Sequence, residues 1–299
     1  IALALSRKAN RPVKLVMSRE EVFRASGPTS STSIDVKLGA KKNGEITAGQ
    51  VELRYQGGAF PGTWAMLGCM TAFACYDIKN QQSVGYDVIV NRPKVAAYRA
   101  PSAPMAAFAV ESTLELLADK IGMSGIDLRL KNVAREGAKA PYGPIYGPIG
   151  IEAALKAVKD HPHMKAKLKK NQGRGIACGF WFNIGGQTCT DINIGVDGTV
   201  NLTLGTVDVG GSRASMSMIA AEELGIPYEQ VKANIADTGS LGHNDMTEGS
   251  RGTFSSGMAT IFAAREAIGV LKQRAAAMWG IPVEDVAWEK GQAIAVGKT

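Results

Sequence analysis

The chain has 299 residues, of which 45% are hydrophobic and 20% are charged, and its formal net charge at pH 7 is +7. This composition excludes an intrinsically disordered chain, and the length is typical of two domains. Charged residues or glycine interrupt every apolar run before it reaches the roughly 18 to 20 residues that span a bilayer, so we expect a soluble protein with no membrane span.

The positive charge is scattered along the chain, apart from one run at Lys165–Lys170. No aromatic residues alternate with these lysines to stack on bases, which argues against nucleic acid as a partner. A bound anionic cofactor and an acidic neighbouring subunit explain the charge equally well.

The cysteines form neither a close CxxC pair nor a dense disulfide pattern. They are Cys69, Cys75, Cys178 and Cys189. We expect reduced thiols packed as small apolar residues, which indicates a cytoplasmic protein. No metal site is predicted, because His161 and His163 lie in a lysine-rich segment that has the character of solvated surface.

The first predicted elements lie before residue 57. Residues 1–10 resemble the second half of an amphipathic helix and residues 13–17 (V-K-L-V-M) a strand, so the chain is expected to begin inside a longer protein. Alternating apolar positions over residues 30–56, with a K-N-G turn at 42–44, predict a β-hairpin.

A strand, a bend and a helix follow in the first half. Residues 85–98 predict a strand that leads into a proline-rich bend, and residues 105–122 have helical spacing. Residues 126–137 predict a short helix. The Gly and Pro content of residues 137–150 predicts a linker, so we divide the chain into two domains, 1–140 and 141–299.

The second half repeats this style. Helices are predicted over residues 151–161, 215–224 and 253–280, strands over residues 175–183, 190–198 and 199–209, and a final hairpin around Lys290 and Gly291. The last predicted helix has an apolar face that we expect to be buried. It consists of Met258, Ile261, Phe262, Ala264 or Arg265, Ile268 and Leu271. The predicted class is α+β, and the chain is expected to stop inside a sheet.

Three loops rich in Gly, Ser and Thr each join a strand to a helix, at residues 97–104, 208–215 and 237–257. Backbone N–H groups at a helix start can hold an anion, so these loops suggest a phosphate or pterin site. The alternative is that Gly and Ser merely form tight turns.

Five segments in order resemble landmarks of the xanthine dehydrogenase and aldehyde oxidase family. They are RPVKLVMSREE (11–21), AYRAPSAPMAAFAVES (97–112), DLRLKNVAREG (127–137), TVDVGGSRASMSMIAAEELGIP (206–227) and TEGSRGTFSSGMA (247–259). The resemblance implies two consecutive mixed α/β domains of the molybdenum hydroxylase large subunit. It also implies a molybdenum-pterin cofactor, which a cytosine nucleotide often extends. Such an enzyme oxidises an aldehyde or N-heterocycle with oxygen from water, and electrons leave through iron–sulfur clusters and FAD on partner subunits or domains.

The resemblance assigns roles to individual residues. Arg99 would lie beside the molybdenum, the alternative being a salt bridge at a strand end. The cofactor-binding residues would be Gly210, Gly211 and Ser212 in one loop and Gly249, Ser250, Arg251 and Gly252 in another. Most relatives have Gln where this chain has Gly211. Pro101 and Phe180 would line the substrate pocket, and Pro101 replaces the aromatic of purine-hydroxylating relatives.

The expected activity depends on segments that the chain does not contain. Carbon monoxide dehydrogenases bind copper through a cysteine where this chain has Ala100, so that chemistry is excluded. The family's Gly-x-Gly-Glu general base is not found, and Glu248 is the only acid in the metal-facing motif. We therefore expect the isolated chain to be inactive without the remainder of the large subunit. The alternatives are a scaffold subunit that has lost the cofactor, and an enzyme acting alone on a phosphorylated metabolite.

Overall fold

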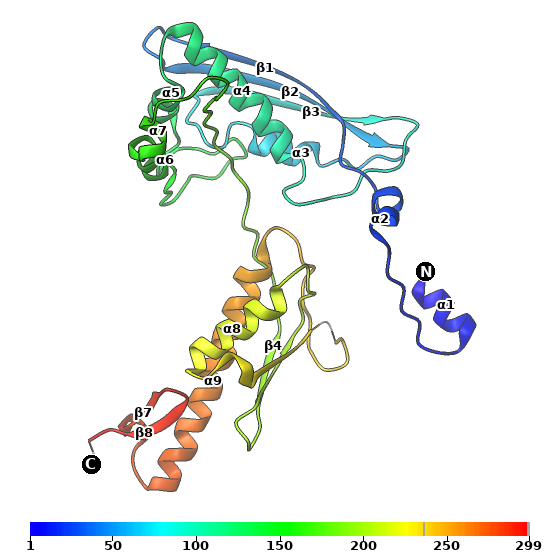
Figure 1. Cartoon of the computed structure of the whole chain (residues 1–299), viewed down its shortest axis with the longest axis vertical. Coiled ribbons are helices and arrows are strands. Elements are labelled where there is room, and N and C mark those ends of the chain that lie inside the picture. Colours follow the sequence, from blue (N-terminus) through cyan, green and yellow to red (C-terminus); the bar gives the residue numbers. More distant parts are fainter. Residues whose placement is uncertain (236, 298–299) are drawn as a thin grey trace. The chain divides into compact units, whose positions relative to one another are not determined.

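The computed structural model describes residues 1–235 and 237–297. The chain folds into two compact units, Ile1–Trp181 and Phe182–Thr299. Each unit combines helices with a sheet of its own (Figure 1), which confirms the predicted α+β class.

The first unit contains a three-stranded sheet in the order β1-β2-β3. Strand β1 (Thr32–Ala40) pairs antiparallel with β2 (Ile46–Gly58), which confirms the predicted hairpin. Its turn contains Gly44 at φ 84°, a left-handed conformation that glycine adopts at low cost. Strand β3 (Asn80–Ile89) then runs parallel to β2 after a crossover that contains α3 (Ala65–Thr71).

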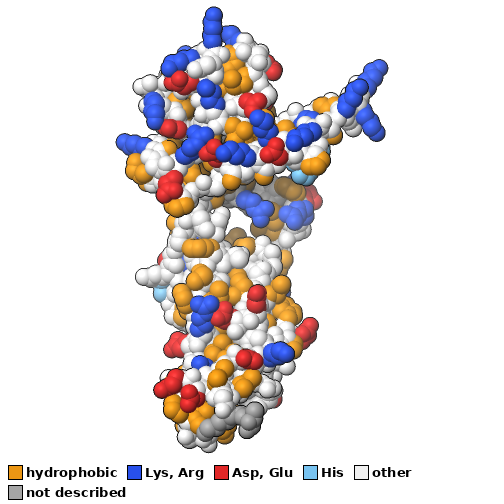
Figure 2. Space-filling view, turned by 90° about the vertical axis from the view of Figure 1, so that its left-hand side faces the viewer, with side chains coloured by type: hydrophobic (Ala, Val, Ile, Leu, Met, Phe, Trp, Pro, Cys, Tyr) orange, Lys and Arg blue, Asp and Glu red, His pale blue; other side chains and the backbone are white. Residues whose placement is uncertain are grey.

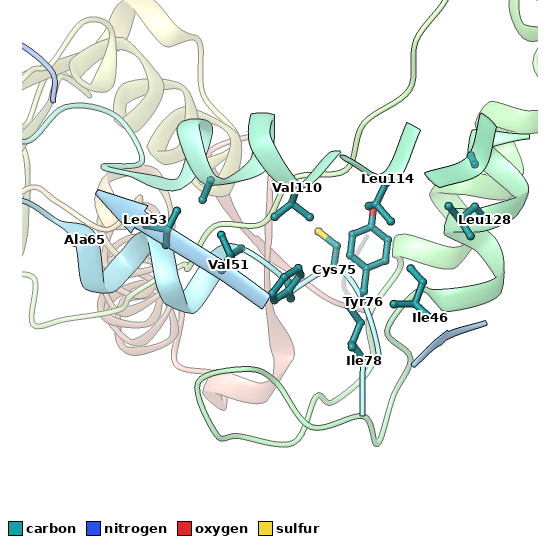
Figure 3. Packing of buried hydrophobic residues seen from close by; sticks show 14 of the residues in the cluster. Ile46, Val51, Leu53, Ala65, Cys75, Tyr76, Ile78, Val110, Leu114 and Leu128 are labelled. Carbon is teal, nitrogen blue, oxygen red and sulfur yellow. The ribbon is translucent and has the colours of Figure 1, made fainter. Parts of the chain in front are cut away.

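Helix α4 (Ala103–Ile121) packs on this sheet and completes the first core. Val51 and Leu53 of β2 lie two residues apart and therefore point to the same face. There they join Val110 and Leu114 of α4 in one buried cluster (Figure 3). The predicted helix over residues 105–122 is thus confirmed, and it begins at the end of the first candidate loop.

A buried ion pair fixes α5 (Gly125–Asn132) against α4. Arg129 is fully buried, and its Nε donates to the Glu111 carboxylate at 2.9 Å. The Tyr76 hydroxyl donates to the other oxygen of Glu111 at 2.6 Å. These contacts explain Arg129 of the DLRLKNVAREG landmark as part of the core rather than of a site.

The segment after α5 also belongs to the first compact unit. Helix α6 (Ile151–Asp160) buries Leu155 against Ile126 and Val133, and the short helix α7 (Pro162–Lys165) follows. The predicted domain boundary near residue 140 stays a prediction.

Two predicted strands are wrong, and a third, predicted over residues 85–98, ends at Ile89 as part of β3. Residues 13–17 form no strand between α1 (Ala2–Ala9) and α2 (Arg19–Ala25), and neither helix has a buried residue. Residues 175–183 also lie outside any strand, and one backbone N–H of this segment bonds to a side chain instead of to a neighbouring strand. The Cys178 N–H donates to Glu111 Oε2 at 2.9 Å.

The second unit repeats the strand pattern of the first. Strand β4 (Thr190–Ile194) pairs antiparallel with β5 (Val200–Leu204), and β6 (Val231–Ile235) pairs parallel with β5. The crossover contains α8 (Ser212–Leu224) and a 3-10 turn at Tyr228–Gln230. The predicted helix and the two predicted strands before it are confirmed.

Helix α9 (Arg251–Trp279) buries only part of the predicted face. Ala264 is buried and Ile268 packs against the core of the second unit, as predicted. Phe262 is 59% exposed and Met258 is 40% exposed, whereas Gly257 and Thr260 are buried with the predicted Ala264. Small residues replace part of the apolar face because α8 packs closely there. A Cβ added at Gly257 would lie 3.1 Å from a methyl carbon of Ile219 in α8.

The chain ends in the predicted hairpin, in which β7 (Val286–Glu289) pairs antiparallel with β8 (Gln292–Ala295) after a 3-10 turn at Val283–Asp285. No helix within residues 1–235 and 237–297 combines the length and the apolar character needed to cross a membrane.

Charge divides unequally between the two units. The first carries 26 Lys and Arg against 14 Asp and Glu, and the second carries 8 against 13. On the face shown in Figure 2, blue side chains are correspondingly abundant on the first unit. The net positive charge of the chain therefore belongs to the first unit alone.

Candidate functional site

The three candidate loops share one backbone feature at the point where each enters its helix. The residue that precedes the helix is left-handed in each case: Ser102 at φ 69°, Gly211 at φ 104° and Ser250 at φ 62°. None of the three caps its helix through its own side chain. Non-glycine residues in this conformation are strained by roughly 1–3 kcal/mol, and such strain is concentrated at functional sites.

The first loop is hydrogen-bonded to strand β2 of the sheet. Tyr55 of β2 is buried, and its hydroxyl donates to the backbone oxygen of Ser102 at 2.8 Å. Burial raises the pKa of Tyr55, so the phenol stays protonated and remains a donor. Arg99 is exposed on this loop. Among the described residues, its guanidinium has no carboxylate within ion-pair distance.

The two predicted pocket residues of the first unit have different surroundings. Pro101 is half-buried on the loop of Arg99. Phe180 packs against two aromatic rings, with its centroid 5.9 Å from that of Tyr142 and 6.3 Å from that of Tyr146. A groove of about 470 Å³ lies between β1 and α4, and Pro104 and Phe108 are among its lining residues. Neither Pro101 nor Phe180 lines it.

In the second loop, a carboxylate of the chain itself occupies the backbone donors. Oδ1 of Asp208 accepts the N–H groups of Gly210 at 3.0 Å, Gly211 at 2.8 Å and Ser212 at 3.1 Å. The first two of these hydrogen bonds are the main cause of a lowered pKa of Asp208. A Cβ at Gly210 or Gly211 would meet nothing within 4 Å, so the loop is open on its outer side.

Sequence reasoning had missed Asp208, although an Asp two residues before a Gly pair is a signal for such a turn. The carboxylate of Asp208 therefore already occupies the backbone N–H donors at the start of α8. The N–H groups of Gly210, Gly211 and Ser212 can serve an external anion only if they share it with Asp208 or if Asp208 moves.

The third loop lies against a segment that sequence reasoning also missed, residues 184–188 (I-G-G-Q-T). The Ile184 N–H donates to the Gly249 oxygen at 2.9 Å. The Gln187 N–H donates to Asp245 Oδ2 at 2.6 Å, and the Asp245 N–H donates back to the Gln187 oxygen at 3.0 Å. The Gly-Gly pair of this segment was the available signal.

A contact between a histidine and a carboxylate on the same loop lies beside the predicted motif. His243 Nε2 lies 3.0 Å from Asp245 Oδ1, and His243 is the leading cause of a lowered pKa of Asp245. Glu248 is exposed, and its backbone oxygen accepts the Arg251 N–H at 3.1 Å. Within the described part of the chain, no three His, Cys, Asp or Glu side chains are grouped to hold a metal ion.

Both halves of the sequence match families of one description. Residues 1–133 and residues 151–299 each match a family described as "Molybdopterin cofactor-binding domain". The chain belongs to the molybdopterin cofactor-binding family. Together the two matches extend over nearly the whole chain and over both compact units.

Similar proteins are molybdenum-dependent oxidoreductases by name. The chain is 25% identical to the xanthine dehydrogenase molybdenum-binding subunit of Escherichia coli O157:H7, over 91% of this chain and 38% of that protein. It is 28% identical to the carbon monoxide dehydrogenase large chain of Afipia carboxidovorans, over 93% of this chain and 39% of that protein. The chain thus spans about two fifths of these curated relatives.

A solved structure shows the same fold. Quinoline 2-oxidoreductase from Pseudomonas putida 86 superposes with a TM-score of 0.83, at 20% identity, over 98% of this chain and 41% of that chain. This likeness confirms the fold predicted from the family resemblance.

Each helix start by itself offers a limited set of donors to an anionic cofactor. The helix starts at Ser102 and Ser250 have no side-chain cap of their own. At α4, however, the Ala103 N–H donates to the Ala100 oxygen and Pro104 has no N–H, and at α9 the Arg251 N–H donates to the Glu248 oxygen. Each of these two helix starts therefore has fewer N–H donors for an anion than an ordinary helix start. The start of α8 also offers N–H donors, but Asp208 accepts from them. The predicted cofactor contacts at these loops stay predictions.

Proposed function

We propose that this chain is the molybdopterin-binding part of a molybdenum hydroxylase that oxidises an aldehyde or an N-heterocycle. The observation that carries the proposal is the shared geometry of the three loops, each with a left-handed residue directly before a helix start, in a chain whose two units both match molybdopterin-binding domains. When bound, the cofactor supplies the metal centre and the two-electron redox chemistry.

The residues of this chain hold and orient the cofactor and the substrate in this proposal. Arg99 donates hydrogen bonds beside the metal, as its exposure at the strained bend before α4 permits. The backbone of Gly249, Ser250 and Gly252 contacts the cofactor, and the side chain of Arg251 is turned into the protein. Gly210, Gly211 and Ser212 form the other cofactor loop once Asp208 shares or releases their N–H groups.

The substrate class follows from the pocket residues assigned by resemblance. Pro101 offers no aromatic face for a purine, so an aldehyde or a smaller N-heterocycle is favoured over a purine. Ala100 has no sulfur to ligate copper, so carbon monoxide is not the substrate. The general base lies outside this chain, and the isolated chain is inactive without the remainder of the large subunit.

In this proposal, electrons leave through iron–sulfur and FAD groups on partner subunits or domains, and the cofactor is a molybdenum-pterin of the kind that a cytosine nucleotide often extends in the family that the chain resembles. The excess of Lys and Arg in the first unit suits an anionic cofactor or an acidic partner surface.

A scaffold that has lost the cofactor is the competing function, because Asp208 occupies the donors at α8 and Gly211 replaces the usual Gln. The experiment that decides is metal analysis together with pterin fluorescence on the full-length parent protein. About one molybdenum and one pterin per large subunit support the proposed function, as expected for a tightly held cofactor. A folded parent without pterin establishes the scaffold.

A further inference from the structure

Arg251, the first residue of α9, is almost completely buried, with 3% of its surface exposed. Its Nη1 donates to the backbone oxygens of Asp245 at 2.8 Å and Met246 at 3.2 Å. Its Nη2 donates to the backbone oxygen of Gln187 and to the hydroxyl of Thr188. One guanidinium therefore joins residues 187–188 to residues 245–246, which are far apart in the sequence.

The same two segments are also tied through their own backbones. The Gln187 N–H and oxygen both bond to Asp245, and the Ile184 N–H bonds to the Gly249 oxygen. All these contacts lie within the second unit. The two segments and the Arg251 side chain form one clamp, which we define as residues 184–188, residues 245–250 and Arg251.

Glycines mark where this clamp has no spare room. A Cβ at Gly186 would lie 2.7 Å from Asp245 Oδ2 and 2.9 Å from Arg251 Nε. A Cβ at the adjacent Gly185 would meet nothing within 4 Å. Gly249 is left-handed at φ 58°, and a Cβ there would lie 2.8 Å from the Cβ of Ile184. The close approach of Gly186 to Arg251 and that of Gly249 to Ile184 thus leave the two segments of the clamp little room to move.

We propose that Arg251 is a positioning residue that, through this clamp, holds Gly249 and Ser250 in their left-handed conformation at the start of α9. Its side chain does not contact the cofactor. The planar fork of donors reaches four acceptors in two directions, which a lysine ammonium cannot do. The purpose of this positioning, presenting the loop to a molybdopterin, rests on the proposed function, whereas the clamp itself does not.

Hydrogen exchange on this chain without cofactor tests the clamp. We expect the amides of Ile184, Gln187 and Asp245 to exchange about tenfold faster or more in Gly186→Ala and in Arg251→Lys, because the bonds that protect them open locally. The matched controls are Gly185→Ala in the same segment and Arg265→Lys, an exposed arginine of the same helix. Both controls should stay within about twofold of the wild-type rates.

Unchanged exchange in both Gly186→Ala and Arg251→Lys would overturn the clamp. If both variants instead lose the whole second unit, Arg251 is an ordinary core residue and the positioning role is also refuted. Faster exchange confined to the clamp, with the amides in the middle of α9 unaffected, supports it.

The link to the cofactor has a separate readout, the pterin content of the full-length parent. Gly186→Ala should reduce the pterin bound per chain about tenfold, and Gly185→Ala should not. Full pterin content in Gly186→Ala, despite faster exchange, would refute the positioning role. A wild-type parent without pterin would refute the proposed function and leave the exchange result standing.

Discussion

At the scale of single residues, the structure separates side chains that face solvent at the candidate loops from those that hold the loops in place. Arg99 is exposed at a strained bend, whereas Arg251 is buried and bonded to backbone oxygens. Both arginines stand in motifs that resemble the same family. The motifs alone make the two arginines equally good candidates for binding a ligand. Of the two, only Arg99 has an exposed guanidinium.

Replacing Arg99 by Lys in the full-length parent should lower turnover about tenfold or more, which corresponds to roughly 1.4 kcal/mol of lost transition-state stabilisation. Lys keeps the charge but loses the directional fork. The measurement is steady-state turnover normalised to molybdenum content, with Arg92→Lys, another exposed arginine of the first unit, as the control. Normal turnover per metal in the Arg99 variant would remove this residue from the site.

Asp208 should make the stability of the second loop depend on pH. Its pKa is lowered by the N–H groups of Gly210 and Gly211, so its contribution is fully present above its unfolded pKa of about 4 and is lost as the pH falls through the lower folded pKa. Exchange protection at Gly210 and Gly211 should therefore fall below about pH 4 in the wild type. In Asp208→Ala the protection should be low at every pH, and protection in that variant equal to that of the wild type near neutral pH would contradict this cause.

At the scale of elements, both units use the same solution for their sheet, a hairpin followed by a parallel strand, with a helix in the crossover. A left-handed residue ends the loop that leads into the helix in α4, α8 and α9 alike. The helices are fixed by burial of small or apolar side chains, which keeps the loop ends at defined positions. The elements are thus the rigid supports of the candidate loops.

The ion pair between α4 and α5 should be costly to break. Arg129→Met leaves the buried Glu111 carboxylate without its partner, and we expect a loss of about 3–5 kcal/mol in the free energy of unfolding. Chemical denaturation measures this loss in the free energy of unfolding of the first unit. Arg135→Met, which removes an exposed partner of Glu152, should cost only about 0–1 kcal/mol. If the two substitutions lowered the free energy of unfolding equally, burial of the ion pair would not be the cause of the loss.

At the scale of the whole molecule, the two units differ in charge although they share their architecture. The first unit has a large excess of basic residues and the second a small excess of acidic ones. The cysteines also follow the units, with Cys69, Cys75 and Cys178 in the first and Cys189 in the second. All four are free in the structure.

The number of thiols that react with a thiol reagent should differ between the folded and the unfolded chain. Cys75 is buried, and burial raises its pKa, so it should not react with a thiol reagent in the folded chain. After unfolding without reductant, all four should titrate. Thiol counting before and after denaturation tests this, and fewer than four free thiols in the unfolded chain would reveal a disulfide.

The sequence alone determined the α+β class, the hairpins, the helices α4, α8 and α9, and the family, because periodicity, turn residues and ordered motifs are local properties of the chain. Tertiary structure alone decided what depends on a partner distant in sequence. Residues 175–183 look like a strand, yet the Cys178 N–H bonds to the side chain of Glu111, and α9 buries Gly257 and Thr260 because α8 lies close. The prediction that Arg251 contacts the cofactor stays a prediction, but the sequence did not show that its guanidinium finds acceptors at residues 187–188, more than sixty positions away. The sequence shows which hydrogen-bond donors a residue has, but only the folded chain brings acceptors from distant parts of the sequence within bonding distance.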